Sequence, residues 1–221
     1  MTRHRTAAGA LAALAACLLL VAAATAAAAP PPFRAVVRAV SPAERAAMTP
    51  SVWRPGCPVA LSQLRHVSLP YIDFRGRPRR GALVVHNSVA GQVVTVFRAL
   101  YEARFPIRRM RPIQAYGGSD FRSIEADNTS AFNCRYVDGT TRWSEHAGGR
   151  AIDVNPIENP YVSGGRTSHR ASVPYVSRTP YRKGMAVEGR VLVRAFDAAG
   201  WGWGGRWSGD KDYQHFSASG R

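Results

Sequence analysis

The chain has 221 residues, of which 46% are hydrophobic, and its 30 Lys and Arg against 14 Asp and Glu give a formal net charge of +16. This length is sufficient for one domain with a substantial hydrophobic core. Residues 7–29 form the one apolar run long enough to cross a bilayer, so we expect no later membrane span.

Residues 1–29 are expected to be a secretory signal peptide. A basic start, Met1 to Arg5, precedes the apolar run, and small residues before Pro30 suit cleavage near Ala29. A retained membrane anchor and a lipoprotein processed within Leu14–Cys17 remain as alternatives. Export excludes nucleic acid as a partner and leaves anionic wall polymers or phospholipid surfaces, although the charge is equally consistent with a solvated surface.

Two cysteines, Cys57 and Cys134, lie beyond the signal segment. An even pair in an exported protein predicts a disulfide, with two free buried thiols as the alternative. A bond across so long a loop is worth roughly 4 to 5 kcal/mol on the chain-entropy account.

Residues 30–52 are rich in Pro, Ala and Arg and are expected to be a linker or an N-terminal arm ahead of one domain, residues 53–221. The β-branched run 81–86 follows a Gly-Arg-Pro turn and predicts a strand. Residues 89–104 place apolar side chains on one face and predict an amphipathic helix that ends before the next proline. Residues 107–113 predict another strand.

The second half of the domain is richer in turns. We expect a polar loop over 117–133, a short strand over 151–154 and a surface excursion over 159–181. Residues 187–199 predict a helix that glycine ends, and strands with tight turns follow from residue 201. Strands and helices alternate without βαβ regularity, so the pattern predicts an α+β fold.

Two short motifs carry the chemistry. Ser-Glu-His146 is followed seven residues later by Asp153, and His215 closes Asp212-Tyr-Gln-His near the C-terminal end. Two imidazoles and one carboxylate supply zinc with three ligands and leave one position open, as in catalytic zinc sites. A turn through Gly148-Gly149 must bring the first two side chains together, and His215 must come from an adjacent strand.

The patterns Ser-x-His-x-x-Gly-x-Ala-x-Asp and Asp-x-x-His resemble the zinc peptidases that include D-alanyl-D-alanine carboxypeptidases and L-alanyl-D-glutamate endopeptidases. The resemblance covers about residues 53–216 and includes every fixed position of both motifs. It implies a hedgehog/DD-peptidase-like α+β fold, in which helices flank a small antiparallel sheet. It also implies His146, Asp153 and His215 as zinc ligands, Asp212 as catalytic base and bacterial peptidoglycan stem peptides as substrates.

Two further assignments follow from the resemblance. The family holds the scissile carbonyl oxygen with an arginine, and Arg122 in Gly-Ser-Asp-Phe-Arg-Ser is the best match. Relatives specialised for D-Ala-D-Ala place Glu where this chain has Asp212, which favours the endopeptidase branch without settling the choice. Asp210 is a competing candidate for the base, although its spacing fits the motif less well.

Three residues besides the ligands, Asp212 and Arg122 are predicted to contact substrate or to lie near the ligands. Ser144 is expected to hydrogen-bond near the ligands. Asn128 is expected to contact substrate, with a structural turn role as the alternative. Trp203, one of several tryptophans interleaved with glycine, is expected in a binding wall or in core packing.

Two functions from different classes remain open at this point. The first is a secreted zinc metallopeptidase that hydrolyses peptide bonds in peptidoglycan. The second is a non-catalytic cell-wall-binding module with a structural zinc, which the positive charge and the aromatic C-terminal segment favour. A base at Asp212 argues for the enzyme, because a structural zinc has no need of one.

Overall fold

The fold is α+β, as the sequence predicts. The structure is a computed structural model and describes residues 31–221, so the expected signal peptide lies outside the described residues. The helices are α1 (Pro42–Met48), α2 (Ala90–Glu102), α3 (Asp120–Glu125) and α4 (Val191–Asp197). The strands are β1 (Val36–Ala39), β2 (Leu64–Ile72), β3 (Pro78–His86), β4 (Arg109–Met110), β5 (Asn128–Thr129), β6 (Ala151–Asp153), β7 (Tyr161–Val162), β8 (Gly202–Trp203), β9 (Lys211–Asp212) and β10 (His215–Ser217).

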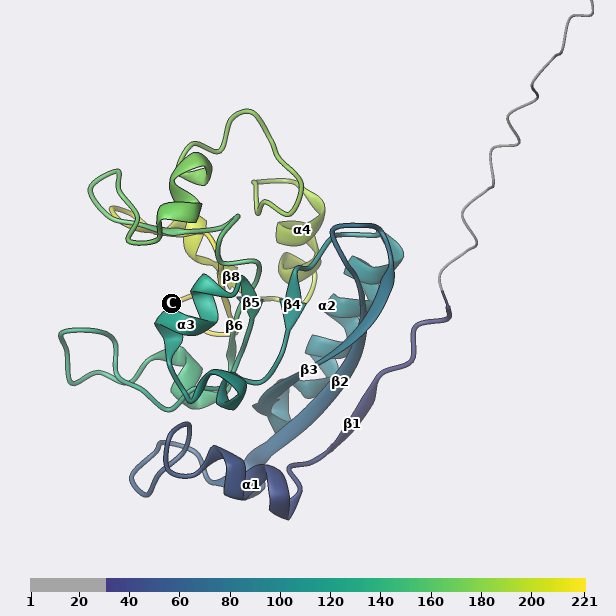
Figure 1. Cartoon of the computed structure of the whole chain (residues 1–221), viewed down its shortest axis with the longest axis vertical. Coiled ribbons are helices and arrows are strands. Elements are labelled where there is room, and N and C mark those ends of the chain that lie inside the picture. The colour runs from purple at the N-terminus through teal and green to yellow at the C-terminus, as the bar shows by residue number, and fades with distance from the viewer. Residues whose placement is uncertain (1–30) are drawn as a thin grey trace, which may run out of the picture.

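The first half of the domain is an antiparallel sheet with one long helix against it. β1, β2 and β3 pair in that order, and α2 packs on β2 (Figure 1). The face of α2 that the sequence predicts as apolar is buried, including Val93, Phe97 and Leu100. The second sheet, β6-β10-β8, is also antiparallel and lies on the side of the molecule that α4 and the C-terminal segment occupy.

One hydrophobic core joins these two halves. It contains Val67 and Phe97 from the first half and Ile152, Phe196 and Phe216 from the second, all 0% or 1% exposed. The rings of Phe196 and Phe216 stack with centroids 4.1 Å apart. Burial of the large apolar side chains on both sides of the sheets is the main force that holds β6 and β10 against the rest of the domain.

The segment expected to be a linker or arm is part of the fold. β1 pairs with β2 along its whole length, and α1 begins with a capping box in which Ser41 and Glu44 satisfy each other's backbone N–H groups. Met48 and Val52 are fully buried. β1 is an edge strand whose residues are all exposed, so its sequence does not alternate between apolar and polar residues. Its pairing with β2 comes from backbone hydrogen bonds.

Three other segments differ from the sequence-based expectation. β2 is a strand over residues for which the sequence predicts no element. Pro70 lies inside it, and proline is rare within paired strands. The loop expected over 117–133 contains α3, which Ser119 caps by accepting from the backbone N–H of Arg122 (3.3 Å), and then β5. The strand expected over 107–113 is shortened to β4.

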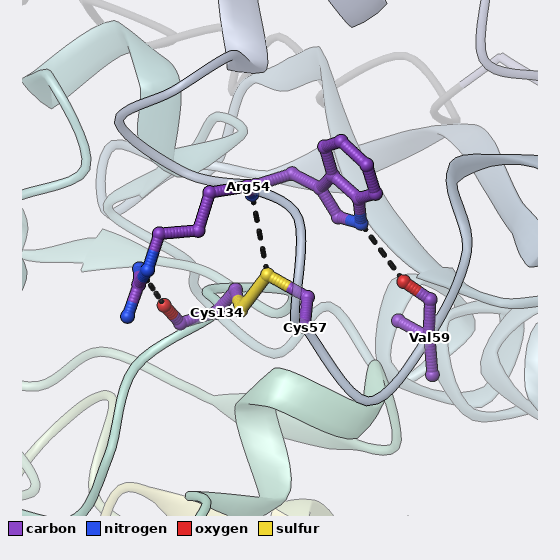
Figure 2. The surroundings of a disulfide bond; sticks show 5 residues. Arg54, Cys57, Val59 and Cys134 are labelled. Atoms are coloured by element: carbon purple, nitrogen blue, oxygen red, sulfur yellow. Dashed lines mark hydrogen bonds between the residues drawn. A yellow bond between two sulfur atoms is a disulfide. The ribbon is translucent and has the colours of Figure 1, made fainter.

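The predicted disulfide between Cys57 and Cys134 forms in the structure (Figure 2). Arg54 spans the bond: its backbone N–H donates to Cys57 Sγ (3.2 Å) and its guanidinium donates to the carbonyl of Cys134 (2.9 Å). Trp53 donates its indole N–H to the carbonyl of Val59 (2.8 Å). The segment after α1 is thereby tied to the chain that leads into the first predicted metal-binding motif.

Within residues 31–221 no helix combines the length and the apolar character that crossing a bilayer requires.

Candidate metal centre

The structure brings the three predicted ligands to one point. His146 lies in the 3₁₀ turn Glu145–Gly148, Asp153 ends β6, and His215 begins β10. In the antiparallel register, His215 stands directly opposite Asp153, so their side chains project from the same face of the sheet. One ligand atom from each of the three residues lies within 4.8 Å of the other two, and all three residues are buried.

Gly149 makes the approach of His146 to β6 possible. Its φ of 66° lies in the left-handed region, and a Cβ there would come within 2.8 Å of the backbone nitrogen of His86. That nitrogen donates to the carbonyl of Gly149 (2.8 Å), so the turn is held against β3. The reversal expected at Gly148-Gly149 therefore depends on Gly149, because only glycine combines this conformation with this contact.

Both imidazoles are oriented by backbone carbonyls. His146 Nδ1 donates to the carbonyl of Ala131 (2.7 Å), and His215 Nε2 donates to the carbonyl of Arg221 (2.8 Å). These bonds leave His146 Nε2 and His215 Nδ1 as the atoms that face each other, 3.2 Å apart. Asp153 completes the group, with Oδ2 3.2 Å from His146 Nε2 and Oδ1 3.3 Å from His215 Nδ1.

This donor set fits a divalent transition metal. Two imidazole lone pairs and a carboxylate that converge without a cation repel one another. Carbonyl groups that accept from the outer ring nitrogen of each histidine, and so fix its tautomer, are a regular feature of metal sites. The pKa values of His215 and Asp153 also indicate that positive charge is favoured among the three ligands. Burial acts to lower the pKa of His215, but Asp153 outweighs it and raises that pKa to about 9. Burial acts to raise the pKa of Asp153, but the two imidazoles hold it well below its usual range.

Asp212 lies in β9, which pairs with β7 so that Asp212 stands opposite Tyr161. Its Oδ1 is buried and has no hydrogen-bond partner among the described residues. Burial, and then repulsion from Asp153, raise the pKa of Asp212 to about 7. A metal ion on the neighbouring ligands would lower that pKa again, since positive charge favours the carboxylate.

Asp210, the competing candidate for the base, lies in a different environment. It is exposed, and its Oδ2 accepts a hydrogen bond from the hydroxyl of Tyr161 (2.7 Å). That hydrogen bond lowers the pKa of Asp210. Asp210 is therefore exposed and engaged with Tyr161, whereas Asp212 keeps a buried carboxylate oxygen without a partner among the described residues.

The ligands and both aspartates line one open cavity of about 800 Å³, which we call the metal cavity. Its size is in the range of a site for a peptide fragment or a small molecule. Exposed aromatic side chains, Phe121 and Tyr161, also line it. Trp207 lies beside His215, with ring centroids 5.4 Å apart.

The other sequence-predicted site residues are divided between the metal cavity and the rest of the fold. Ser144 lines the cavity and accepts a hydrogen bond from the backbone N–H of His146 (3.3 Å), as expected. Asn128 is buried, where it holds the backbone of Arg111 through its N–H (2.9 Å) and its carbonyl (3.0 Å). Trp203 is buried in the core and donates to the carbonyl of Tyr213 (2.9 Å). Asn128 and Trp203 therefore take the structural roles that were their alternatives.

Arg122 is not brought to the ligands. It is exposed on α3, its guanidinium lies beside Gly117, and it is not among the residues that line the metal cavity. Instead the cavity contains Arg135, whose guanidinium donates to Asp120 (2.8 Å). The sequence gives one clue to Arg135, its position directly after Cys134, because the disulfide fixes the backbone there.

Residues 138–218 match the model of a family described as D-alanyl-D-alanine carboxypeptidase. The matched region contains all three predicted ligands and Asp212, and it confirms the resemblance drawn from the two motifs. No curated protein and no solved structure gives a significant match to the chain.

Proposed function

We propose that this protein is a secreted zinc metallopeptidase that hydrolyses peptide bonds in peptidoglycan stem peptides, as a D-Ala-D-Ala carboxypeptidase or an L-Ala-D-Glu endopeptidase. The match over residues 138–218 supports a peptidase of the bacterial cell wall. The observation that carries the proposal is the convergence of His146, Asp153 and His215 at the base of an open cavity that Asp212 also lines.

The three ligands would hold zinc through two nitrogens and one carboxylate, which is the composition of known catalytic zinc sites. When bound there, zinc supplies Lewis-acid chemistry, since it polarises a carbonyl oxygen and makes a water molecule more acidic. Asp212 accepts the proton of the attacking water at its free Oδ1 and returns it to the nitrogen of the leaving amine.

Arg135 is proposed for the electrostatic role that the sequence assigned to Arg122. Its guanidinium is held in the metal cavity by Asp120, and a fixed cation in a partly desolvated cavity stabilises negative charge that develops on a substrate oxygen. Ser144 supports the turn that carries His146.

The test is incubation of purified, zinc-loaded protein with a mixture of muropeptides, followed by mass spectrometry. We expect one class of peptide bond to be cleaved. A carboxypeptidase would release free D-alanine and shorten the stem peptide by one alanine residue, whereas an endopeptidase would release the stem from D-glutamate onward and leave L-alanine on the muramyl group. Removal of zinc with a chelator should stop cleavage, and restored zinc should recover it.

Protein that binds one zinc per chain and leaves every muropeptide intact would overturn the peptidase. If that protein also sediments with purified cell walls, the non-catalytic wall-binding module becomes the better description.

A further inference from the structure

Charge is distributed unevenly over this molecule. Six acidic residues line the metal cavity, Asp120, Asp138, Glu145, Asp153, Asp210 and Asp212, together with three arginines, Arg135, Arg142 and Arg221. The segment 64–111, which comprises β2, β3, α2 and β4, carries ten arginines against two acidic residues, Asp73 and Glu102. The excess of positive charge in the chain is therefore concentrated away from the cavity in which the chemistry is proposed.

Several of these arginines meet where β3 and β4 lie side by side. The two strands approach closely at Gly81, where a Cβ would come within 2.5 Å of the carbonyl oxygen of Met110. Met110 is buried, and the arginines on either side of it, Arg109 and Arg111, are exposed. On β3, Arg79 precedes Gly81 by two residues and stands opposite Tyr71 of β2.

We call Tyr71, Arg79, Arg109 and Arg111 the Tyr71 cluster. Tyr71 is half-buried, and burial raises the pKa of its hydroxyl, while the charges of Arg79, Arg111 and Arg109 act to lower it. All three guanidinium groups therefore lie within electrostatic range of one phenol. The cluster combines the hydroxyl of Tyr71 with three guanidinium groups, of which that of Arg79 is paired with Asp73 and those of Arg109 and Arg111 are exposed.

The acid nearest the cluster is already engaged. Asp73 accepts from the backbone N–H groups of Arg75 and Arg77 (2.9 Å each) and from the side chains of Arg77 (3.2 Å) and Arg79 (3.0 Å). Arg109 and Arg111 make no ion pair or side-chain hydrogen bond within residues 31–221. Asn128 fixes the backbone of Arg111 from both sides, so its guanidinium starts from a fixed position.

We propose that the Tyr71 cluster binds the phosphodiester groups of a linear anionic polymer. Guanidinium groups bind phosphate through paired hydrogen bonds, and exposed cations that lack an acidic partner can be neutralised by such a chain. The lining of the metal cavity contains more acidic residues than arginines, whereas segment 64–111 contains five arginines for each acid, so the segment attracts such a polymer more strongly than the cavity does. A membrane surface fits less well, because none of the exposed large apolar residues of the described chain belongs to β3 or β4, the strands that carry Arg79 and Arg109.

The experiment measures binding of synthetic poly(glycerol phosphate) to the zinc-loaded protein by isothermal titration calorimetry at several salt concentrations. Wild type should bind, with affinity that falls as salt rises. The double variant Arg109→Ala/Arg111→Ala should bind roughly 10- to 30-fold more weakly, on the basis of the usual contribution of a cation at an anionic surface. A matched control, Arg166→Ala/Arg194→Ala, removes the same charge from two other exposed arginines and should change affinity less than about twofold on the same basis.

Equal weakening by the two double variants would overturn the proposal, because binding would then reflect net charge and no particular site. Binding to vesicles that contain phosphatidylglycerol without binding to poly(glycerol phosphate) would also overturn it, in favour of a membrane surface. The result does not depend on the metal: polymer binding that persists with chelator, in protein that cleaves no muropeptide, would support the cluster while the peptidase fails.

Discussion

Asp212 and Asp210 lie two residues apart and differ sharply in environment. Oδ1 of Asp212 is buried and without a partner, whereas Asp210 is exposed and bound by Tyr161. Asp212→Asn keeps the size of the side chain and removes the proposed base. We expect kcat to fall by about 10² to 10⁴, with one zinc still bound per chain, in a muropeptide cleavage assay paired with metal analysis. Asp210→Asn is the matched control and should keep most of the activity; the reverse ranking would assign the base to Asp210.

Arg135 and Arg122 form a second contrasting pair. Arg135 lines the metal cavity and is paired with Asp120, while Arg122 lies on the exposed side of α3. Arg135→Ala should lower kcat/KM by roughly 10² to 10³, as loss of a donor to a developing negative charge does in other enzymes. Arg122→Ala should leave kcat/KM nearly unchanged. Loss of activity in Arg122→Ala alone, with normal thermal unfolding, would restore the sequence-based assignment.

The residues that form the candidate metal centre could be predicted because each motif fixes both residue type and spacing. His146 and Asp153 are joined by one glycine turn, so their proximity is nearly a local property. The choice between Arg122 and Arg135 is different. It depends on which face of a six-residue helix packs inward, and tertiary contacts decide that where the segment has no hydrophobic periodicity of its own.

At the scale of elements, the N-terminal end of α1 illustrates a charge-dependent contribution to stability. Arg38 binds both oxygens of Glu44 at 2.6 Å, and this pairing lowers the pKa of Glu44 to about 2. Because the folded-state pKa lies below the unfolded value, the stabilisation is present above about pH 4.5 and is lost as the pH falls toward 2. Glu44→Gln retains an acceptor for the N–H of Ser41 and removes the charge.

Glu44→Gln should therefore reduce the free energy of unfolding at pH 7 by about 0.5 to 1 kcal/mol, the range for partly exposed ion pairs. The difference from wild type should shrink to near zero by about pH 2. Urea unfolding across this range measures it. A difference that stays constant with pH would show that the substitution acts through the helix cap and not through charge.

The disulfide is a second element-scale feature, since it joins residues 77 positions apart. Cys57→Ser/Cys134→Ser should lower the free energy of unfolding by about 4 kcal/mol. Without the cross-link, the unfolded chain has a higher conformational entropy and is therefore more stable relative to the folded state. Chemical unfolding with and without reductant measures the effect. Reduced wild type should match the double variant, and a loss below about 1 kcal/mol would mean that the bond constrains little in the unfolded state.

Helices and strands could be predicted where one face of the element is buried. They could not be predicted where pairing with another strand, and not the local sequence, determines the structure. α2 was predicted almost to its ends because its apolar residues recur with helical spacing. β1 and β2 were missed for opposite reasons: β1 is exposed along its length, and β2 contains a proline. In both strands the pairing partner, and not the local sequence, supplies the evidence for the strand.

At the scale of the whole molecule, the candidate centre depends on segments that only the complete fold brings together. His146 is oriented by Ala131, and His215 by Arg221. On the proposed function, zinc would bind this arrangement and not the unfolded chain, so zinc at one hundred times its dissociation constant should stabilise the protein by about 2.7 kcal/mol. Thermal unfolding with and without chelator measures the shift, and Asp153→Asn should remove most of it. An equal shift in that variant would place the metal elsewhere.

The pairing of β6 with β10 sets how the chain can tolerate changes in length. A displacement of β10 by a single residue would turn His215 to the opposite side of the sheet from Asp153, since side chains alternate along a strand. Insertions within the exposed part of the surface excursion, residues 163–166, should leave that alignment intact, whereas a one-residue deletion between Asp212 and His215 should abolish it. Variation among natural relatives should accordingly be frequent in the excursion and absent from the three-residue step.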